Sequence, residues 1–223
     1  MCNENTCAKK PVSNEQPYSN LRRSEKEVLR FILNFVLKSG KAPTPKRIGD
    51  TLKRPSKDII RTLDELEGKD LLLRRKGTQE IVSIYPFSLE ATPHQLFLEK
   101  GKRLFAMCAV DALGMPAMFK RDVRIGSRCG KCKHNITVEI RNEDIVSKSH
   151  PGIMIWRAGS QDSLPDAETC CPKINFFCSK EHVEEWKAKN PELVKSGQAV
   201  PLKLVYPEIK KHWKEYGKSI GVR

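Results

Sequence analysis

The chain has 223 residues, with 41 lysines and arginines against 27 aspartates and glutamates, and its formal net charge is +14. This length allows one large domain or two small ones, and the longest apolar runs, such as 31–37, are too short to span a membrane. The N-terminal segment MCNENTCAKK has no apolar signal core, so we expect a cytoplasmic protein with no membrane partner.

The positive charge is spread along the whole chain. Residues 1–90 hold 18 Lys/Arg and 12 Asp/Glu, a net of +6, and residues 91–223 hold 23 and 15, a net of +8. A nucleic-acid-binding module usually concentrates its basic residues on one face. The even distribution therefore indicates a solvated basic surface.

The N-terminal half reads as a tail followed by a small helical module. Polar residues 1–20 predict a flexible tail in which Cys2 and Cys7 are incidental. Helical spacing of apolar residues, with caps and stops, predicts helices at 24–39, 45–52 and 56–68 and strands at 71–73 and 81–85. Three helices and a hairpin predict a winged-helix-like module over residues 21–90.

Winged-helix modules often read DNA with their third helix. Here that helix, SKDIIRTLDELE, has only Lys57 and Arg61 beside four carboxylates, which phosphate groups would repel. Arg74 and Arg75 in the wing remain able to touch a phosphate backbone. We favour a packing or lid-forming role for the module and do not expect nucleic acid as a partner.

Residues 91–223 form the second predicted domain. Pro93 predicts a helix start at HQLFLEK, and Gly114 and Pro116 are expected to end or kink a helix-like run at 103–119. Further expected elements are strands at 122–127, 135–140 and 153–156, a helix capped by Ser179, a strand-like LKLVY at 202–206 and a basic helical tail. The predicted fold class is α+β: a winged-helix-like N-terminal module, then a domain with a small antiparallel sheet and flanking helices.

The apolar run RLFAMCAVDALGMPAMF carries one thiol and one carboxylate, Cys108 and Asp111. Three residues apart on a helix, they share one face. An unpaired buried carboxylate is costly, so Asp111 is either satisfied by hydrogen bonds or placed to handle a proton. Taken alone, the run favours a packed cysteine beside a capping aspartate.

A second thiol pattern is Cys129-Gly-Lys-Cys132, which has the spacing of half a tetrahedral zinc site. No second Cys-x-x-Cys follows it, and the candidates for the two missing ligands are Cys170, Cys171, Cys178, His134, His150 and His182. We favour a buried Cys129 at a strand end with Cys132 exposed. A zinc-stabilised binding module remains an alternative.

A third grouping combines Cys108 and Asp111 with one of the adjacent pair Cys170 and Cys171. Two thiolates and a carboxylate suit a soft, thiophilic cation. The group lacks the fourth ligand of a closed zinc site, and an open position beside a proton donor indicates chemistry.

The segments FAMCAVDALGMPAMF and CCPKINFFCSKEHVEEW, in this order after a winged-helix-like module, resemble the organomercurial lyase (alkylmercury lyase) family over about residues 95–190. The resemblance implies that residues 91–223 are the catalytic domain and that Cys108, Asp111 and one cysteine of the 170–171 pair react. Counting back from the Phe-Phe pair at 176–177, and from Cys129 without a gap, selects Cys171. Cys129 falls where the family tends to carry a structural cysteine, whereas Cys132 and Cys178 look like additions.

The resemblance also implies the reaction. An organomercurial is cleaved by protonolysis to a hydrocarbon and Hg(II), for mercury detoxification, with the mercury held by Cys108, Asp111 and Cys171. No organic cofactor is expected, and cellular thiols or a mercuric reductase would accept the Hg(II). The alternative from a different class is a thiol-based, soft-metal-sensing DNA-binding regulator, which the acidic third helix disfavours.

Overall fold

The computed structural model describes residues 18, 20–158, 166–194 and 197–222. The predicted tail with Cys2 and Cys7 lies almost entirely outside these residues. Across the described part of the chain, no helix combines the length and the apolar character that crossing a membrane requires.

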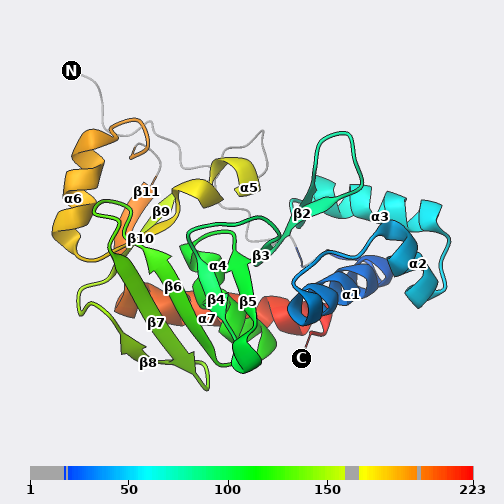
Figure 1. Ribbon diagram of the computed structural model, residues 1–223. Helices are drawn as coiled ribbons and strands as arrows, with labels where there is room; N and C mark the ends of the chain where they lie inside the picture. The colour runs from blue at the N-terminus through cyan, green and yellow to red at the C-terminus, as the bar shows by residue number, and fades with distance from the viewer. Residues whose placement is uncertain (1–17, 19, 159–165, 195–196, 223) are drawn as a thin grey trace.

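The N-terminal helices lie where local sequence signals place them. They are α1 (Arg23–Ser39), α2 (Pro45–Leu52) and α3 (Ser56–Gly68), followed by the hairpin strands β1 (Leu72–Arg74) and β2 (Ile81–Ile84). Gly40 ends α1 in the left-handed conformation, and the Thr44 hydroxyl accepts a hydrogen bond from the Arg47 N–H at the start of α2. These helices form one end of the molecule (Figure 1).

A large sheet joins this module to the rest of the chain. Within the described residues it has eight strands in the order β1-β2-β3-β5-β4-β6-β7-β8, and every pair is antiparallel. The further strands are β3 (Phe87–Ser88), β4 (Gln95–Phe97), β5 (Arg103–Ala106), β6 (Val123–Arg128), β7 (Asn135–Arg141) and β8 (Asp144–Lys148). The mixed helix and antiparallel-sheet class is confirmed, although the sheet is larger than predicted because the hairpin adds to it.

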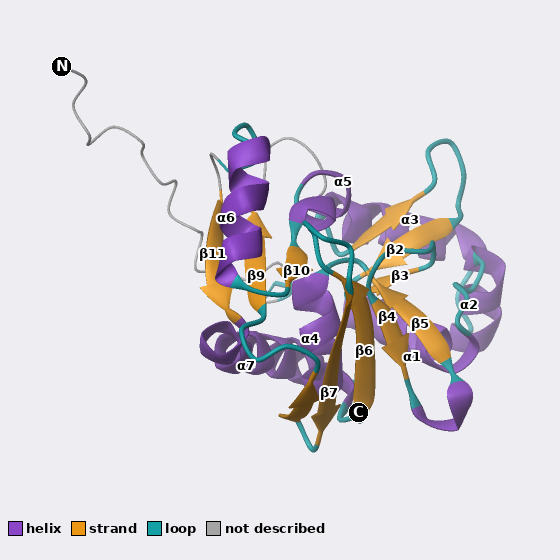
Figure 2. Ribbon diagram, turned by 60° about the vertical axis from the view of Figure 1, so that its left-hand side comes forward, coloured by secondary structure: helices purple, strands orange, loops and turns teal. Residues whose placement is uncertain are grey.

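A second sheet of three described strands has the order β10-β9-β11. Its strands are β9 (Met154–Ala158), β10 (Asn175–Phe177) and β11 (Gly197–Pro201), and α5 (Asp166–Thr169) precedes β10. Helix α6 (Lys180–Lys189) follows β10 and packs on this sheet, at the opposite end of the molecule from α1–α3 (Figures 1 and 2).

Two predicted elements are wrong. The segment HQLFLEK forms β4 and a short 3₁₀ turn, η1 (Glu99–Gly101), because β4 pairs with β5 and β6 on its two sides. The segment LKLVY opens the helix α7 (Leu202–Ile220). The five residues LKLVY are too few to show the helical spacing of the buried face of α7. That face includes Val205, Ile209, Trp213, Tyr216 and Ile220.

The run 103–119 also divides differently from the prediction. Its first four residues are strand β5, and the helix α4 begins only at Ala109 and continues past Pro116 to Phe119. Helices α4 and α7 pack together on one face of the large sheet (Figures 1 and 2). Their contact is close at Gly114, where a Cβ atom would lie 1.9 Å from Cδ1 of Trp213. Only glycine fits there, so this contact fixes the position of α4.

Candidate active site

Cys108 occupies the N-cap of α4. Its backbone is extended, with φ −147° and ψ 179°, and its Sγ accepts a hydrogen bond from the backbone N–H of Asp111 at 3.4 Å. The helix N-terminus favours a negatively charged group at this position. The backbone N–H of Ala109 donates to the Ile174 carbonyl at 3.2 Å, which ties the start of α4 to the segment that carries Cys171.

Cys171 begins a short 3₁₀ turn, η2 (Cys171–Lys173), between α5 and β10. Its Sγ lies 4.0 Å from Oδ2 of Asp111. One ligand atom each from Cys108, Asp111 and Cys171 lie within 4.8 Å of one another, and all three residues are buried. The structure thus brings together the three predicted site residues across 63 positions of sequence, from 108 to 171.

The side chain of Cys170 points away from Cys108 and Asp111. Its thiol donates to the carbonyl oxygen of Ala158 at 3.5 Å. Burial raises the pKa of this thiol to about 12, and the charge of Asp166 adds to the effect. Of the two adjacent cysteines, Cys171 is therefore the one that faces Cys108 and Asp111.

Burial controls the protonation of the group. It raises the pKa of Asp111 to about 7, although hydrogen bonds from Cys108 act in the opposite direction. It also raises the pKa of Cys108 well above its usual value, with further contributions from the Cys171 hydrogen bond and the Asp111 charge. At neutral pH the Cys108 thiol keeps its proton, while Asp111 is poised between its two states.

The three residues line a cavity of about 430 Å³. Its other walls are largely apolar and aromatic, with Val110, Ile174, Ile209, Trp213, Tyr216 and Tyr18 among them. Tyr18 belongs to the predicted tail, yet it is only 7% exposed, and its ring stacks on Tyr216 with centroids 4.6 Å apart. Sequence reasoning missed Tyr18 because one aromatic residue in a polar segment carries no pattern.

Tyr85 is a second cavity residue that the sequence did not indicate. It follows β2, and its hydroxyl oxygen lies 3.6 Å from the Cys171 sulfur. Burial raises the pKa of Tyr85 well above its usual value, so the phenol remains protonated. It can therefore donate a hydrogen bond to Cys171 when that sulfur is a thiolate.

The Cys129 pattern lies apart from this cavity. Cys129 is buried at the end of β6, as predicted, whereas Cys132 is half-buried instead of exposed. Burial by itself raises the pKa of Cys129, but hydrogen bonds from the backbone N–H groups of Cys132, Cys178 and Lys131 outweigh it and lower the pKa to about 6. This thiol is accordingly the most acidic of those with a resolved shift in the described chain.

The family model described as alkylmercury lyase, MerB, matches residues 87–213. The chain belongs to the alkylmercury lyase family. The match includes Cys108, Asp111 and Cys171.

Individual alkylmercury lyases agree with this assignment. The chain is 28% identical over 169 residues to the alkylmercury lyase of Bacillus cereus, which covers 75% of this chain and 74% of that protein. It is 25% identical over 166 residues to that of Staphylococcus epidermidis, covering 74% and 73%, and 30% identical over 105 residues to that of Pseudomonas putida, covering 47% and 49%.

A solved structure extends the likeness to the fold. The crystal structure of the mercury-bound form of MerB2 superposes with a TM-score of 0.76 at 26% sequence identity, and the alignment covers 90% of this chain and 95% of that one. The chain is therefore an alkylmercury lyase, an enzyme that cleaves the carbon–mercury bond of organomercurials to a hydrocarbon and Hg(II). The predicted family and reaction are confirmed, and nothing supports the regulator alternative.

Proposed function

We propose that Cys108, Asp111 and Cys171 carry out the cleavage in this alkylmercury lyase. The observation that supports the proposal is the approach of two sulfurs and a carboxylate oxygen, from three buried residues, to within 4.8 Å of one another in the wall of a cavity. Soft sulfur ligands suit mercury, and the carboxylate supplies a group that can move a proton.

In the first step Asp111 removes the proton of Cys108, and the thiolate displaces the ligand X from R–Hg–X. The pKa of Asp111, about 7, makes it a usable base at neutral pH. The developing negative charge on the Cys108 sulfur is stabilised by the N-terminus of α4 and by the backbone N–H of Asp111, whose nitrogen lies 3.4 Å from that sulfur.

In the second step Cys171 binds the same mercury as a second thiolate, which increases the electron density on the metal and weakens its bond to carbon. Protonated Asp111 then delivers its proton to the departing carbon. Two thiol protons are lost overall: one reaches the hydrocarbon R–H through Asp111, and the other leaves with X. Hg(II) remains bound to Cys108 and Cys171, beside the Asp111 carboxylate.

Release of Hg(II) requires an acceptor with thiols of its own. We infer that cellular thiols or a mercuric reductase remove it, because only competing sulfur ligands match the affinity of the two cysteines. The six cysteines in the described part of the chain are unpaired, which is typical of a reducing compartment and supports a cytoplasmic location.

We further infer that residues 21–90 form a winged-helix-like module beside the catalytic residues 91–223. The order α1-α2-α3-β1-β2 supports this division, and the module supplies Tyr85 and Leu71 to the active-site cavity. A wall-forming role for the module fits these contacts.

The decisive experiment is hydrocarbon release from phenylmercury or methylmercury in excess thiol, comparing the wild-type enzyme with Cys108→Ala. Benzene or methane should form at a rate that depends on Cys108, because that sulfur makes the first bond to mercury. Equal release by the Cys108→Ala variant would show that the reaction takes place elsewhere.

A further inference from the structure

A second cluster of metal-ligand side chains lies outside the active site. It consists of Cys129, Cys132, Cys178 and His182, whose ligand atoms all lie within 4.8 Å of one another. None of the four lines the cavity of Cys108, Asp111 and Cys171. The cleavage reaction gives them no role.

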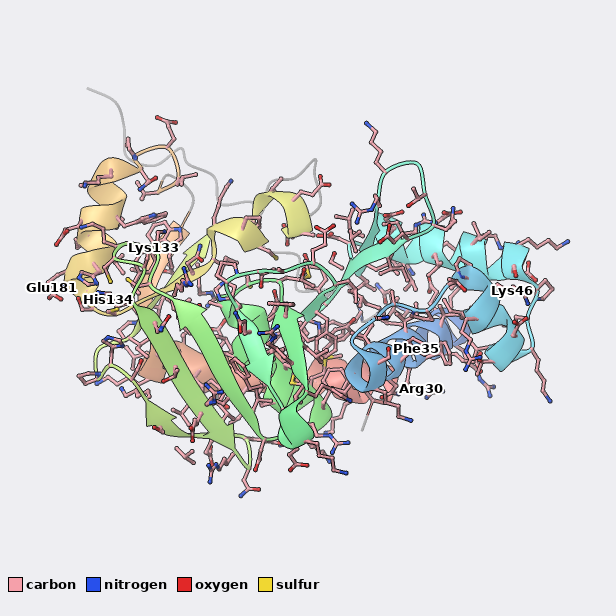
Figure 3. All side chains as sticks on the ribbon, viewed as in Figure 1. Arg30, Phe35, Lys46, Lys133, His134 and Glu181 are labelled. Atoms are coloured by element: carbon pink, nitrogen blue, oxygen red, sulfur yellow. The ribbon has the colours of Figure 1, made fainter. Side chains whose placement is uncertain are left out.

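The cluster joins two segments that are distant in sequence. Cys129 and Cys132 lie in the turn between β6 and β7, Cys178 follows β10, and His182 is in the first turn of α6. Figure 3 labels Lys133 and His134 in the turn and Glu181 at the start of α6, and it shows the two segments side by side. An ion pair between Lys131 and Glu185 connects them.

We propose that these four residues hold a resident, tetrahedral Zn²⁺ ion that stabilises the fold. Zinc binds sulfur at about 2.3 Å and histidine nitrogen at about 2.0–2.1 Å, so a tetrahedron has edges of about 3.8 Å between sulfurs and about 3.6 Å from sulfur to nitrogen. The Cys132 and Cys178 sulfurs are 3.8 Å apart, and the Cys129 sulfur lies 3.6 Å from Nδ1 of His182. Both separations match the edges of such a site.

The turn has the backbone of a metal-binding knuckle. The Lys133 N–H donates to the Cys129 carbonyl at 3.1 Å and the Cys129 N–H donates to the His134 carbonyl at 2.9 Å, so the chain folds back on Cys129. Glycine is required at position 130, because a Cβ there would lie 2.7 Å from Cζ of Phe177. The turn is thus shaped by the packing of β10 and not by the thiols alone.

The ligand set favours structural zinc over the other uses of such thiols. Three cysteines and one histidine close the tetrahedron and leave no open position for a substrate, which is typical of structural sites. The cysteines do not form a disulfide, since 3.8 Å between Cys132 and Cys178 is far longer than a sulfur–sulfur bond of about 2.05 Å. The mercury-binding group shares none of these residues.

The site has a direct connection to the active site through β10. Cys171 stands before this strand and Cys178 directly after it. A zinc ion that anchors one end of β10 therefore helps to hold the turn that presents the Cys171 sulfur. Loss of zinc should loosen this turn without removing any residue that contacts mercury.

The test is elemental analysis of the full-length protein purified without added metal. We expect about one zinc per chain in the wild type, because closed sites of this kind bind zinc tightly. Cys132→Ser, Cys178→Ser and His182→Ala should each lower the zinc content at least fivefold, whereas His182→Cys should retain it. His134→Ala is the matched control, since this histidine lies in the same turn but outside the cluster.

A double variant, Cys108→Ser with Cys171→Ser, separates this proposal from the one for catalysis: it should lose hydrocarbon release and keep its zinc. Co²⁺ added to chelator-treated wild-type protein should give the visible absorption bands of tetrahedral Co²⁺ and a thiolate-to-metal charge-transfer band. This measurement uses only the wild type, so it does not depend on the folding of a variant. Wild type that contains no zinc and binds no cobalt in this way would overturn the proposal, as would unchanged zinc in folded His182→Ala.

Discussion

The sulfur of Cys108 caps the helix on which Asp111 stands, and the backbone N–H of Asp111 donates to that sulfur at 3.4 Å. One helical turn therefore sets the distance between the thiol that we propose attacks mercury and the carboxylate that we propose handles its proton. Their geometry depends on the backbone of α4 and not on flexible side chains. This arrangement leads directly to the first prediction.

Replacing Asp111 by asparagine should leave organomercurial binding in place and lower turnover by about 10²–10⁴-fold, since the two thiols remain while the proton relay is lost. Single-turnover hydrocarbon release measures the chemistry, and equilibrium dialysis of phenylmercury measures binding. In the wild type the rate should fall as the pH drops below about 7, where the carboxylate becomes protonated. Turnover by the asparagine variant at the wild-type rate would remove Asp111 from the mechanism.

Asp111 should also make the folded protein less stable at high pH. Its pKa is about 7 in the folded state against an ordinary value of 3.8, so the folded state binds this proton more tightly than the unfolded state does. The free energy of unfolding has its full contribution from protonated Asp111 below about pH 4. As the pH rises from about 4 to 7 this contribution is lost, and the free energy of unfolding falls by up to about 4 kcal/mol. Urea unfolding should therefore show Asp111→Asn to be more stable than wild type at pH 8 and similar at pH 4. A gain of equal size at both pH values would contradict this reasoning.

The two adjacent cysteines should respond differently to the same change. Cys171→Ser should abolish hydrocarbon release, because serine cannot supply the second soft ligand to mercury. Cys170→Ser should retain most of the activity, since the new hydroxyl can still donate to the Ala158 carbonyl. Steady-state release of benzene from phenylmercury distinguishes the two, and the opposite ranking would mean that Cys170 is the reacting thiol.

Tyr85→Phe should lower turnover by about 10- to 100-fold, with little change in folding. The substitution removes the hydroxyl that lies 3.6 Å from the Cys171 sulfur, and a hydrogen bond to a charged group contributes about 1.5–3 kcal/mol. Tyr206→Phe is the control, because that hydroxyl donates to the Glu143 carbonyl outside the cavity. Equal rates for both variants and the wild type would assign Tyr85 to packing alone.

Gly114→Ala should destabilise the protein by about 1–3 kcal/mol, because its methyl group overlaps the Trp213 ring and separates α4 from α7. Gly68→Ala, at the end of α3, is the matched control: a Cβ there meets nothing within 4 Å. Thermal unfolding should show a clear loss only for Gly114→Ala. A neutral result at position 114 would mean that Trp213 moves aside freely.

Local signals were sufficient for the N-terminal elements. Caps and stops such as Thr44 and Gly40 act within one or two turns, so the end of α1 and the start of α2 could be read from the sequence. The start of α4 could not, because its residues are apolar on nearly every side and give no helical period. Strand β4 was misread for a different reason: its partners on both sides decide its conformation.

The candidate active site was likewise predictable only in part. Cys108 and Asp111 could be singled out by their spacing in an apolar run, and family resemblance added Cys171. Tyr85 could not be found, because its contact with Cys171 spans 86 residues and depends on how the sheet folds. Cys178 and His182 were among the six candidate partners of Cys129 and Cys132, but the sequence could not single them out, because only the packing of β10 and α6 brings them to Cys129.

The continuous sheet has a consequence for any shortened form of this enzyme. Strand β3 covers the outer edge of β5, with Phe87 opposite Ala106. A fragment that begins at residue 91 would expose the backbone N–H and C=O groups of β5 as a template for pairing with other copies. Residues 21–90 would thus keep the edge of β5 from pairing with other copies, and they also supply part of the cavity.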